Sequence, residues 1–332
     1  MTTRQLTSTS TARALWYVDR CLVELRNEQL PDFDPDNSVL IRTHYSGLSR
    51  GTERLVFRGE VPASEADRMR APMQLGAFPF PVKYGYCAVG IIEQGPAKLV
   101  GHAAFCLHPH QDVFVVPQDA ISLIPPHIPV RRATLAANME TALNALWDGN
   151  AKPGDRINVI GAGIVGLLTA FVAAGIPGTS VTIADVSTAR ADIANALGAA
   201  FCTPADLPAN VDVVFHTTAT PEGLQSAIET AGFEATIVEM SWFGTRTAPI
   251  VLGGAFHSRR LNLVSSQVGH VASARRARWS HARRLAKAIE LLSDPRLDAL
   301  VGDEIAFETA PRALPDVFSA DYAGLPPVVR YV

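Results

Sequence analysis

The chain has 332 residues, of which 48% are hydrophobic and 18% charged, so it can bury an extensive core in one large or two medium domains. Its formal net charge of −3 supplies no overall positive field, which argues against nucleic acid or an anionic membrane as the main partner. The scattered cysteines form no C-x-x-C pair, so a reducing cytoplasm is favoured over a disulfide framework. We expect no signal peptide and no membrane span, because no segment offers about 20 uninterrupted apolar residues.

Residues 1–130 are predicted to form a β-rich domain. Short runs rich in β-branched and aromatic residues alternate with turn residues, among them ALWYVDRCLVELR, NSVLIRTHYSG, KYGYCAVGIIEQG and HAAFCLHPHQDVFVVP. This composition is typical of a barrel or a sandwich. The Ala- and Leu-rich stretch TLAANMETALNALWDGN then predicts a helix, which places a domain boundary near residue 130.

Residues 131–268 are predicted to form a doubly wound α/β domain. Apolar strand candidates (RINVIGAG, SVTIADV, VDVVFHTT, EATIVEMSWFG and RLNLVSSQVG) alternate with helix candidates (VGLLTAFVAAG, TARADIANALGA and PEGLQSAIETA). Strands that are covered on both faces can be apolar throughout, so this alternation indicates a parallel sheet. A long amphipathic helix is expected next, over residues 273–294.

A glycine-rich motif, Gly161-Ala162-Gly163-Ile164-Val165-Gly166, joins the first of these strands to a helix. Glycine permits a tight turn and a close approach of the backbone to pyrophosphate, and the helix N-terminus offers N–H groups to phosphate. Asp185 ends the next strand, where a carboxylate can accept hydrogen bonds from an adenosine ribose. The motif therefore predicts an NAD site that includes Gly161, Gly163, Ile164, Val165, Gly166 and Asp185, with a glycine turn and a helix-capping aspartate as the alternative.

Further cofactor neighbours are predicted from their positions. Arg190 could reach a 2′-phosphate or the ribose, so NADP stays open as the less favoured cofactor. Thr217 and Gln267 follow strand candidates at their carboxyl ends, where open parallel sheets bind ligands. His216 is interpreted as structural, since it could point into the sheet.

Over nearly its whole length the chain resembles the medium-chain dehydrogenase/reductase superfamily, the alcohol dehydrogenase group with a GroES-like catalytic domain. The resemblance rests on GLSRGTE at residues 47–53, GYCAVG at 85–90, the stretch from Thr141 to Leu146 before KPGDRINVIGAGIVG, and the ending GLPPVVRYV. It implies a GroES-like catalytic domain at 1–130, a Rossmann domain at 131–268 and a C-terminal return to the catalytic domain at 269–332. It also implies a substrate cleft between the domains and a contact of Arg50 with the cofactor pyrophosphate.

The chain departs from the zinc-dependent members of this superfamily. Those members carry a cysteine at the position of Ser49, a His-Glu pair at the positions of Tyr86 and Cys87, and a third ligand near Ala136 or Ala137. A catalytic zinc needs about three thiolate, imidazole or carboxylate ligands, which these residues do not supply. The four-cysteine structural zinc lobe is also missing, because its segment contains only Cys106. We therefore expect no zinc at either site.

Two other groups of residues in the sequence are of types that bind metals. A displaced site built from Cys87, His44, Glu53 and Glu140 is the alternative to a metal-free chain. His108 and His110 are expected to be exposed loop histidines, because Pro109 between them forces an extended turn.

Without zinc, another group must stabilise or protonate the alkoxide that develops when a carbonyl is reduced. Tyr86 is the first candidate, since its phenol can donate a proton, and Ser49 could hydrogen-bond the substrate oxygen. Glu140 could orient a ribose or relay a proton, and Cys87 could line the substrate pocket. Each has a structural alternative: a packed aromatic for Tyr86, a helix-start acid for Glu140 and an inert buried thiol for Cys87.

The arginines that follow the GLSRGTE motif could recognise an anionic substrate, although ion pairs with neighbouring acids on a solvated face are the simpler interpretation. They are Arg54, Arg58, Arg68 and Arg70.

We predict an NAD(P)(H)-dependent oxidoreductase that interconverts an alcohol and a carbonyl of a small molecule without catalytic zinc. The alternatives are a zinc-free quinone or enoyl reductase, in which enolate stabilisation needs no metal, and a non-catalytic dinucleotide-binding sensor or scaffold. A homodimer formed by sheet continuation through LNLVSSQV is also expected.

Overall fold

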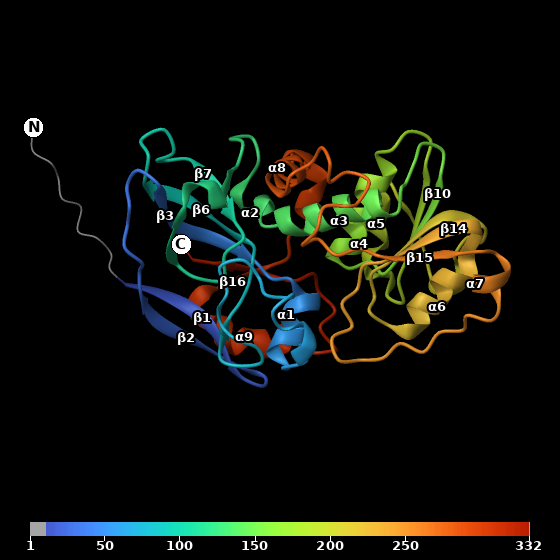
Figure 1. The fold of residues 1–332 in the computed structure, drawn as a ribbon, viewed down its shortest axis with the longest axis horizontal. Coiled ribbons are helices and arrows are strands. Elements are labelled where there is room, and N and C mark those ends of the chain that lie inside the picture. Colours follow the sequence, from blue (N-terminus) through green and yellow to red (C-terminus); the bar gives the residue numbers. More distant parts are fainter. Residues whose placement is uncertain (1–10, 332) are drawn as a thin grey trace, which may run out of the picture. The chain divides into compact units, whose positions relative to one another are not determined.

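The computed structural model describes residues 11–331, which cluster into two compact units (Figure 1). The first unit contains the chain up to residue 134 together with residues 303–323 and the stretch from 327 onward, and the second contains residues 135–302 and 324–326. In this division residues 269–302 lie with the second unit. The domain boundaries expected near 130 and 268 stay a proposal. Within the described residues, no helix has the length and apolar character needed to cross a membrane.

The first unit is β-rich. Its larger sheet has the strand order β16-β17-β3-β6-β7-β9, with β8 paired to β3, and its smaller sheet has the order β2-β1-β5-β4. The strands are β1 (Thr11–Asp19), β2 (Leu22–Gln29), β3 (Ser38–Gly47), β4 (Leu75–Gly76), β5 (Val82–Lys83), β6 (Ala88–Gln94), β7 (Ala103–Cys106), β8 (Val113–Pro117), β9 (Ile121–Leu123), β16 (Glu304–Ala306) and β17 (Val328–Arg330). The helices are α1 (Arg50–Phe57), α2 (Val130–Ala133) and α9 (Ala310–Val317).

Alternating burial along the strands builds the core of this unit. Ile41 of β3, Ile92 of β6 and Phe114 of β8 pack in one buried cluster. Helix α1 starts directly after β3 and buries Leu55, Val56 and Phe57 together with one carboxylate, Glu53. A buried acid on an apolar helix face needs hydrogen-bond partners, so α1 marks a polar site inside the unit.

The second unit is a doubly wound sheet whose strands all pair in parallel, in the order β12-β11-β10-β13-β14-β15. The strands are β10 (Arg156–Ile160), β11 (Ser180–Ala184), β12 (Ala200–Cys202), β13 (Val211–His216), β14 (Ala231–Glu239) and β15 (Asn262–Ser265). The helices are α3 (Ala136–Asp148), α4 (Ile164–Ala174), α5 (Ala191–Ala196), α6 (Pro221–Thr230), α7 (Ala255–Ser258) and α8 (His281–Leu291). The predicted fold class, a Rossmann sheet with a β-rich second domain, is confirmed.

One helix is shorter than expected. The helix predicted over residues 273–294 is found only at His281–Leu291. Ser280 is its N-cap and accepts a hydrogen bond from the N–H of Arg283, which stabilises a helix start at this point. Residues 273–278 form turns instead.

The topology places one end of the sheet for ligand binding. Strand β10 lies between β11 and β13, and the connections from β10 and β13 run to opposite sides of the strand order. Open α/β sheets bind ligands beyond the carboxyl ends of their strands at such a switch point. The glycine-rich motif follows β10 directly, so it occupies that position.

Candidate functional site

The glycine-rich bend has the geometry that the motif predicts. Gly161 has a φ of +106°, a value that L side chains rarely adopt. A Cβ on Gly166 would collide with the carbonyl oxygen of Gly161, whereas a Cβ on Gly163 would meet no atom within 4 Å. Gly163 is the N-cap of α4, so the N–H groups of Ile164, Val165 and Gly166 have no acceptor within the helix. The bend therefore fits an approaching pyrophosphate.

Asp185 and Arg190 both contact this bend. The Asp185 carboxylate accepts a hydrogen bond from the N–H of Ala162 (2.7 Å) and another from the N–H of Ser187 (2.9 Å). The guanidinium of Arg190 donates to the carbonyl oxygens of Ala162 (2.9 Å) and Gly324 (3.1 Å). A carboxylate and a cation thus lie at the same end of β11, which suits a ribose and leaves a 2′-phosphate possible.

Thr217 supports the bend from the neighbouring strand, because its hydroxyl donates to the carbonyl oxygens of Ile160 (2.9 Å) and Gly161 (3.0 Å). Gln267 lies elsewhere, on the exposed loop after β15, where its side chain accepts from the N–H of Gly269 (2.7 Å). His216 is fully buried, and its ring nitrogens contact Glu239 and Thr218, each at 2.6 Å. This placement agrees with a structural role.

In the β-rich unit, Ser49 and Tyr86 lie side by side. The phenol of Tyr86 donates a hydrogen bond of 2.5 Å to the hydroxyl oxygen of Ser49, and both residues are partly exposed. Burial of the ring raises the pKa of Tyr86 and the neighbouring Cys87 adds to this, while its hydrogen-bonding contacts with Ser49 and Thr52 act in the opposite direction. Tyr86 is therefore a protonated phenol at neutral pH, able to donate.

Cys87 is buried, and this burial, with the negative charge of Glu53, raises the pKa of its thiol well above the ordinary value. A protonated thiol in a buried environment is a poor nucleophile. Ser49 and Tyr86 offer only hydroxyls that bond to each other, and Ala136 and Ala137 are buried and apolar. These side chains do not fit a catalytic zinc. Within residues 11–331, no three His, Cys, Asp or Glu side chains gather closely enough to hold a metal ion.

A buried polar cluster lies beneath Ser49, and the sequence did not reveal it. Glu53 and His110 are 1% and 0% exposed, and the His110 Nε2 atom lies 2.9 Å from a carboxylate oxygen of Glu53. The expectation of exposed loop histidines is wrong, because His108 is also buried and stacks on Phe114 at 3.9 Å. Burial lowers the pKa of His108 to about 3. The signal that was available was an acid on the apolar face of the helix at residues 50–57.

Arg50 and Glu140 have protein partners. Arg50 donates to the carbonyl oxygens of Val317 (2.8 Å) and Ser319 (2.6 Å) and stacks over the ring of Tyr322. Glu140 is buried and forms a 2.9 Å ion pair with Arg284. Burial raises the pKa of Glu140, and the charge of Arg284 opposes that rise.

The arginines that follow the GLSRGTE motif have contacts of their own. Arg68 pairs with Glu65, while Arg70 donates to the carbonyl oxygens of Gln74 and Gly76 and Arg58 donates to that of Phe318. The three side chains are thus held by groups of their own unit.

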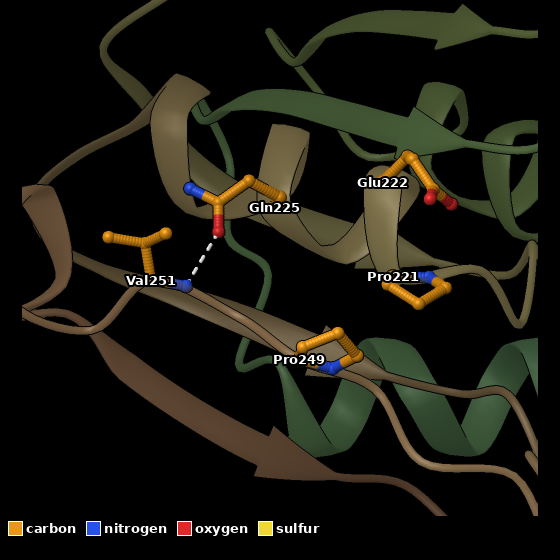
Figure 2. Close-up of a pocket in the computed structure, with 5 residues that line it drawn as sticks. All are labelled: Pro221, Glu222, Gln225, Pro249 and Val251. Carbon is orange, nitrogen blue, oxygen red and sulfur yellow. Dashed lines mark hydrogen bonds between the residues drawn. The ribbon is translucent and has the colours of Figure 1, made fainter.

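A separate open pocket of about 350 Å³ lies at the start of α6. Figure 2 shows Pro221, Glu222 and Gln225 of α6 on one side and Pro249 and Val251 on the other, with the Gln225 side chain accepting from the N–H of Val251 at 2.9 Å. None of the predicted site residues lines it.

Comparison with known proteins places this geometry in context. No family model matches the chain. D-guloside 3-dehydrogenase of Escherichia coli K12 is 25% identical over 309 residues, covering 83% of this chain and 88% of that protein.

Solved structures with the same fold include a protein of Sinorhizobium meliloti 1021, provisionally assigned as a zinc-binding dehydrogenase and bound to NADP (TM-score 0.77, 17% identity, 97% of this chain and 100% of that one). An alcohol dehydrogenase of Escherichia coli CFT073 complexed with NADH has a TM-score of 0.76 at 17% identity, covering 97% of this chain and 99% of that one. Together with the glycine bend, these similarities show that the chain has the fold of NAD(P)-dependent dehydrogenases and resembles members of the medium-chain dehydrogenase/reductase superfamily.

Proposed function

We propose that this oxidoreductase interconverts an alcohol and a carbonyl, with the Tyr86 phenol as hydrogen-bond and proton donor to the substrate oxygen. The observation that carries the proposal is the partly exposed Ser49–Tyr86 hydroxyl pair. Reduction of a carbonyl places negative charge on its oxygen, and a preorganised donor stabilises that charge. The hydroxyls of Ser49 and Thr52 can each donate a hydrogen bond to the phenol oxygen of Tyr86 while Tyr86 shares its proton with the substrate oxygen.

The residues of the glycine bend would hold the nicotinamide dinucleotide, which supplies or accepts a hydride when bound. The N–H groups of Ile164, Val165 and Gly166 would bind its pyrophosphate, and Asp185 its adenosine ribose. We propose NAD as the preferred cofactor, because a carboxylate at this position repels a 2′-phosphate. Arg190, at the same bend, supports some binding of NADP.

The remaining predicted residues are proposed to act indirectly. Arg50 and Glu140 already bind Ser319 and Arg284, so each would position its surroundings, and Cys87 would line the substrate site as an apolar group. We propose chemistry without a metal ion, because a protonated phenol next to a serine hydroxyl supplies the donor that a Lewis acid would otherwise provide. A homodimer through the sheet edge at β15 is proposed from its place at the end of the strand order.

The test is turnover with NADH or NAD⁺ across alcohols, ketones, enones and quinones, followed by nicotinamide absorbance. Sugars and sugar glycosides belong in the panel because D-guloside 3-dehydrogenase is a relative over most of the chain. Turnover of ketones or alcohols that is lost in Tyr86→Phe supports the proposal. Turnover of enones or quinones alone identifies a conjugated-bond reductase, and dinucleotide binding without any turnover indicates a sensor or scaffold.

A further inference from the structure

The Ser49–Tyr86 pair brings together two segments that are distant in sequence, at the start of α1 and just before β6. A hydroxyl–hydroxyl bond is too weak to fix two such segments by itself, since a neutral hydrogen bond contributes about 1 kcal/mol. The buried pair formed by Glu53 and His110 contacts both segments.

Glu53 reaches the first segment. One carboxylate oxygen accepts a hydrogen bond of 2.7 Å from the backbone N–H of Ser49, and the other accepts one of 2.8 Å from the phenol of Tyr17. The first contact satisfies the N-cap amide of α1 and fixes the position of the Ser49 backbone.

His110 reaches the second segment. Gly85, which directly precedes Tyr86, has a φ of +128°, and a Cβ on it would lie 2.9 Å from both Nε2 and Cδ2 of His110. The imidazole edge therefore packs against the Gly85 backbone in the space that any side chain would fill. Because Nε2 of the same ring bonds Glu53, one imidazole connects the two segments.

The hydrogen bonds of this cluster have one consistent direction. A carboxylate only accepts, so Tyr17, the Ser49 amide and His110 Nε2–H all donate to Glu53. The Nδ1 atom of His110 then accepts from the Ser46 hydroxyl (2.6 Å), whose oxygen accepts from Tyr331 (2.8 Å). Each of these polar groups has a partner, and a neutral imidazole with its proton on Nε2 completes the network.

We propose that Glu53 and His110 are positioning residues that hold the Ser49 and Tyr86 hydroxyls in the geometry needed to donate to a substrate oxygen. The proposal rests on the function proposed above. A buried pair of polar side chains is often no more stabilising than apolar side chains of similar volume, so burial energy alone does not account for the Glu53–His110 contact. The contacts of Glu53 and His110 to the Ser49 and Tyr86 segments do account for it.

The first test reads the Tyr86 phenol directly, without a substrate. In protein labelled with ¹³Cζ-tyrosine, the Tyr86 resonance is assigned with Tyr86→Phe. We expect the Tyr86 resonance to shift and broaden in Glu53→Gln and in His110→Asn. The asparagine side chain is shorter than histidine, so it can keep the hydrogen bond to Ser46 but cannot reach the carboxylate of Glu53. His110→Gln, which can still reach Glu53, should restore much of the wild-type signal. His108→Asn, in the same buried loop, should leave it unchanged.

The second test is kinetic. A misplacement of about 1 Å can cost about 100-fold in rate, so kcat should fall by about that factor in His110→Asn and less in His110→Gln. The dissociation constant for NADH should stay within about twofold, because the residues proposed to hold the dinucleotide belong to the glycine bend and not to this cluster. If the wild type turns over no alcohol or carbonyl, the proposed function is wrong, and the Tyr86 resonance still decides the positioning role.

An unchanged Tyr86 resonance in folded Glu53→Gln and His110→Asn would overturn the inference. Where these two variants do not fold, Tyr17→Phe takes their place, because it keeps the ring and removes a single hydrogen bond from Glu53. A displacement or broadening of the Tyr86 signal in Tyr17→Phe supports the role, and an unmoved signal refutes it.

Discussion

The Tyr86 phenol donates a hydrogen bond of 2.5 Å to the hydroxyl oxygen of Ser49, and the sequence resemblance implies that zinc-dependent proteins carry metal ligands at these two positions. A pair of hydroxyls binds a divalent ion weakly but offers donors to a developing alkoxide. The chemistry proposed for this chain depends on that difference.

Replacing Tyr86 by Phe tests the donor role. The ring and its packing are kept, and only the phenolic proton is lost. We expect kcat for carbonyl reduction to fall by about 100-fold or more, the contribution typical of a positioned proton donor. The dissociation constant for NADH, measured by fluorescence titration, should not change. Equal turnover in Tyr86→Phe and wild type would remove Tyr86 from the mechanism.

The pH dependence of turnover follows from the raised pKa of Tyr86. The donor is the protonated phenol, and a pKa above the ordinary value of about 10 keeps it protonated throughout the neutral and mildly alkaline range. Carbonyl reduction at saturating NADH should therefore be flat with respect to this group up to about pH 10 and fall only above it. Alcohol oxidation needs the phenolate as base, so its rate should rise with pH throughout the neutral and alkaline range in which carbonyl reduction stays flat. A fall in reductase turnover near pH 7–8 that wild type shows and Tyr86→Phe does not would contradict the assignment of Tyr86 as a donor with a raised pKa.

The Rossmann unit was predictable because buried parallel strands have continuous apolar runs, and Val213, Val214 and Phe215 of β13 are such a run. Strand β12 was not predicted, since three partly exposed residues give no periodic signal. The glycine motif and Asp185 were predicted because their spacing is local.

The Glu53–His110 pair was beyond sequence reasoning for the opposite reason. Its members are 57 positions apart, and Ser46 is 64 positions from His110. No local pattern encodes such a contact, and the proline between His108 and His110 suggested an exposed turn instead. Burial of that loop depends on packing such as the stack of His108 on Phe114, which only the folded chain provides.

Alanine substitutions at Gly163 and Gly166 should have different effects, one on NADH binding and the other on stability. A Cβ on Gly163 meets nothing within 4 Å, so Gly163→Ala should fold with a stability within about 1 kcal/mol of wild type. The added methyl group would occupy the space through which a pyrophosphate approaches the bend. The dissociation constant of Gly163→Ala for NADH should therefore rise at least about tenfold. Gly166→Ala should lose about 1–3 kcal/mol of stability, because its Cβ collides with the Gly161 carbonyl. Tight NADH binding by Gly163→Ala would place the dinucleotide elsewhere.

Asp185 and Arg190 should set the choice of cofactor in opposite directions. Asp185→Asn removes the charge that repels a 2′-phosphate and weakens a ribose contact, so the preference for NADH over NADPH should fall by about tenfold, the effect of 1.4 kcal/mol. Arg190→Met should weaken NADPH more than NADH. Asp192→Asn, an exposed acid nearby, is the matched control and should change neither constant. Titration calorimetry of wild type and the three variants with both dinucleotides measures these constants. Identical NADH-to-NADPH ratios in all four proteins would show that this end of β11 does not discriminate between the two cofactors.

Removal of metal ions tests whether hydroxyl chemistry suffices. Ser49 and Tyr86 are satisfied by each other, and the Cys87 thiol stays protonated at neutral pH because burial and Glu53 raise its pKa. A strong zinc site needs a deprotonated thiolate, neutral imidazole or carboxylate at about three positions. Protein purified without chelators should therefore contain far less than one zinc per chain, and dialysis against 1,10-phenanthroline should leave kcat unchanged. A zinc-dependent homologue treated in parallel confirms that the chelator acts. The proposed metal-free mechanism would be wrong if the protein contained one equivalent of zinc, if turnover were lost with that zinc, and if added zinc restored turnover. Residues such as His44 and Glu53 would then be the candidate ligands.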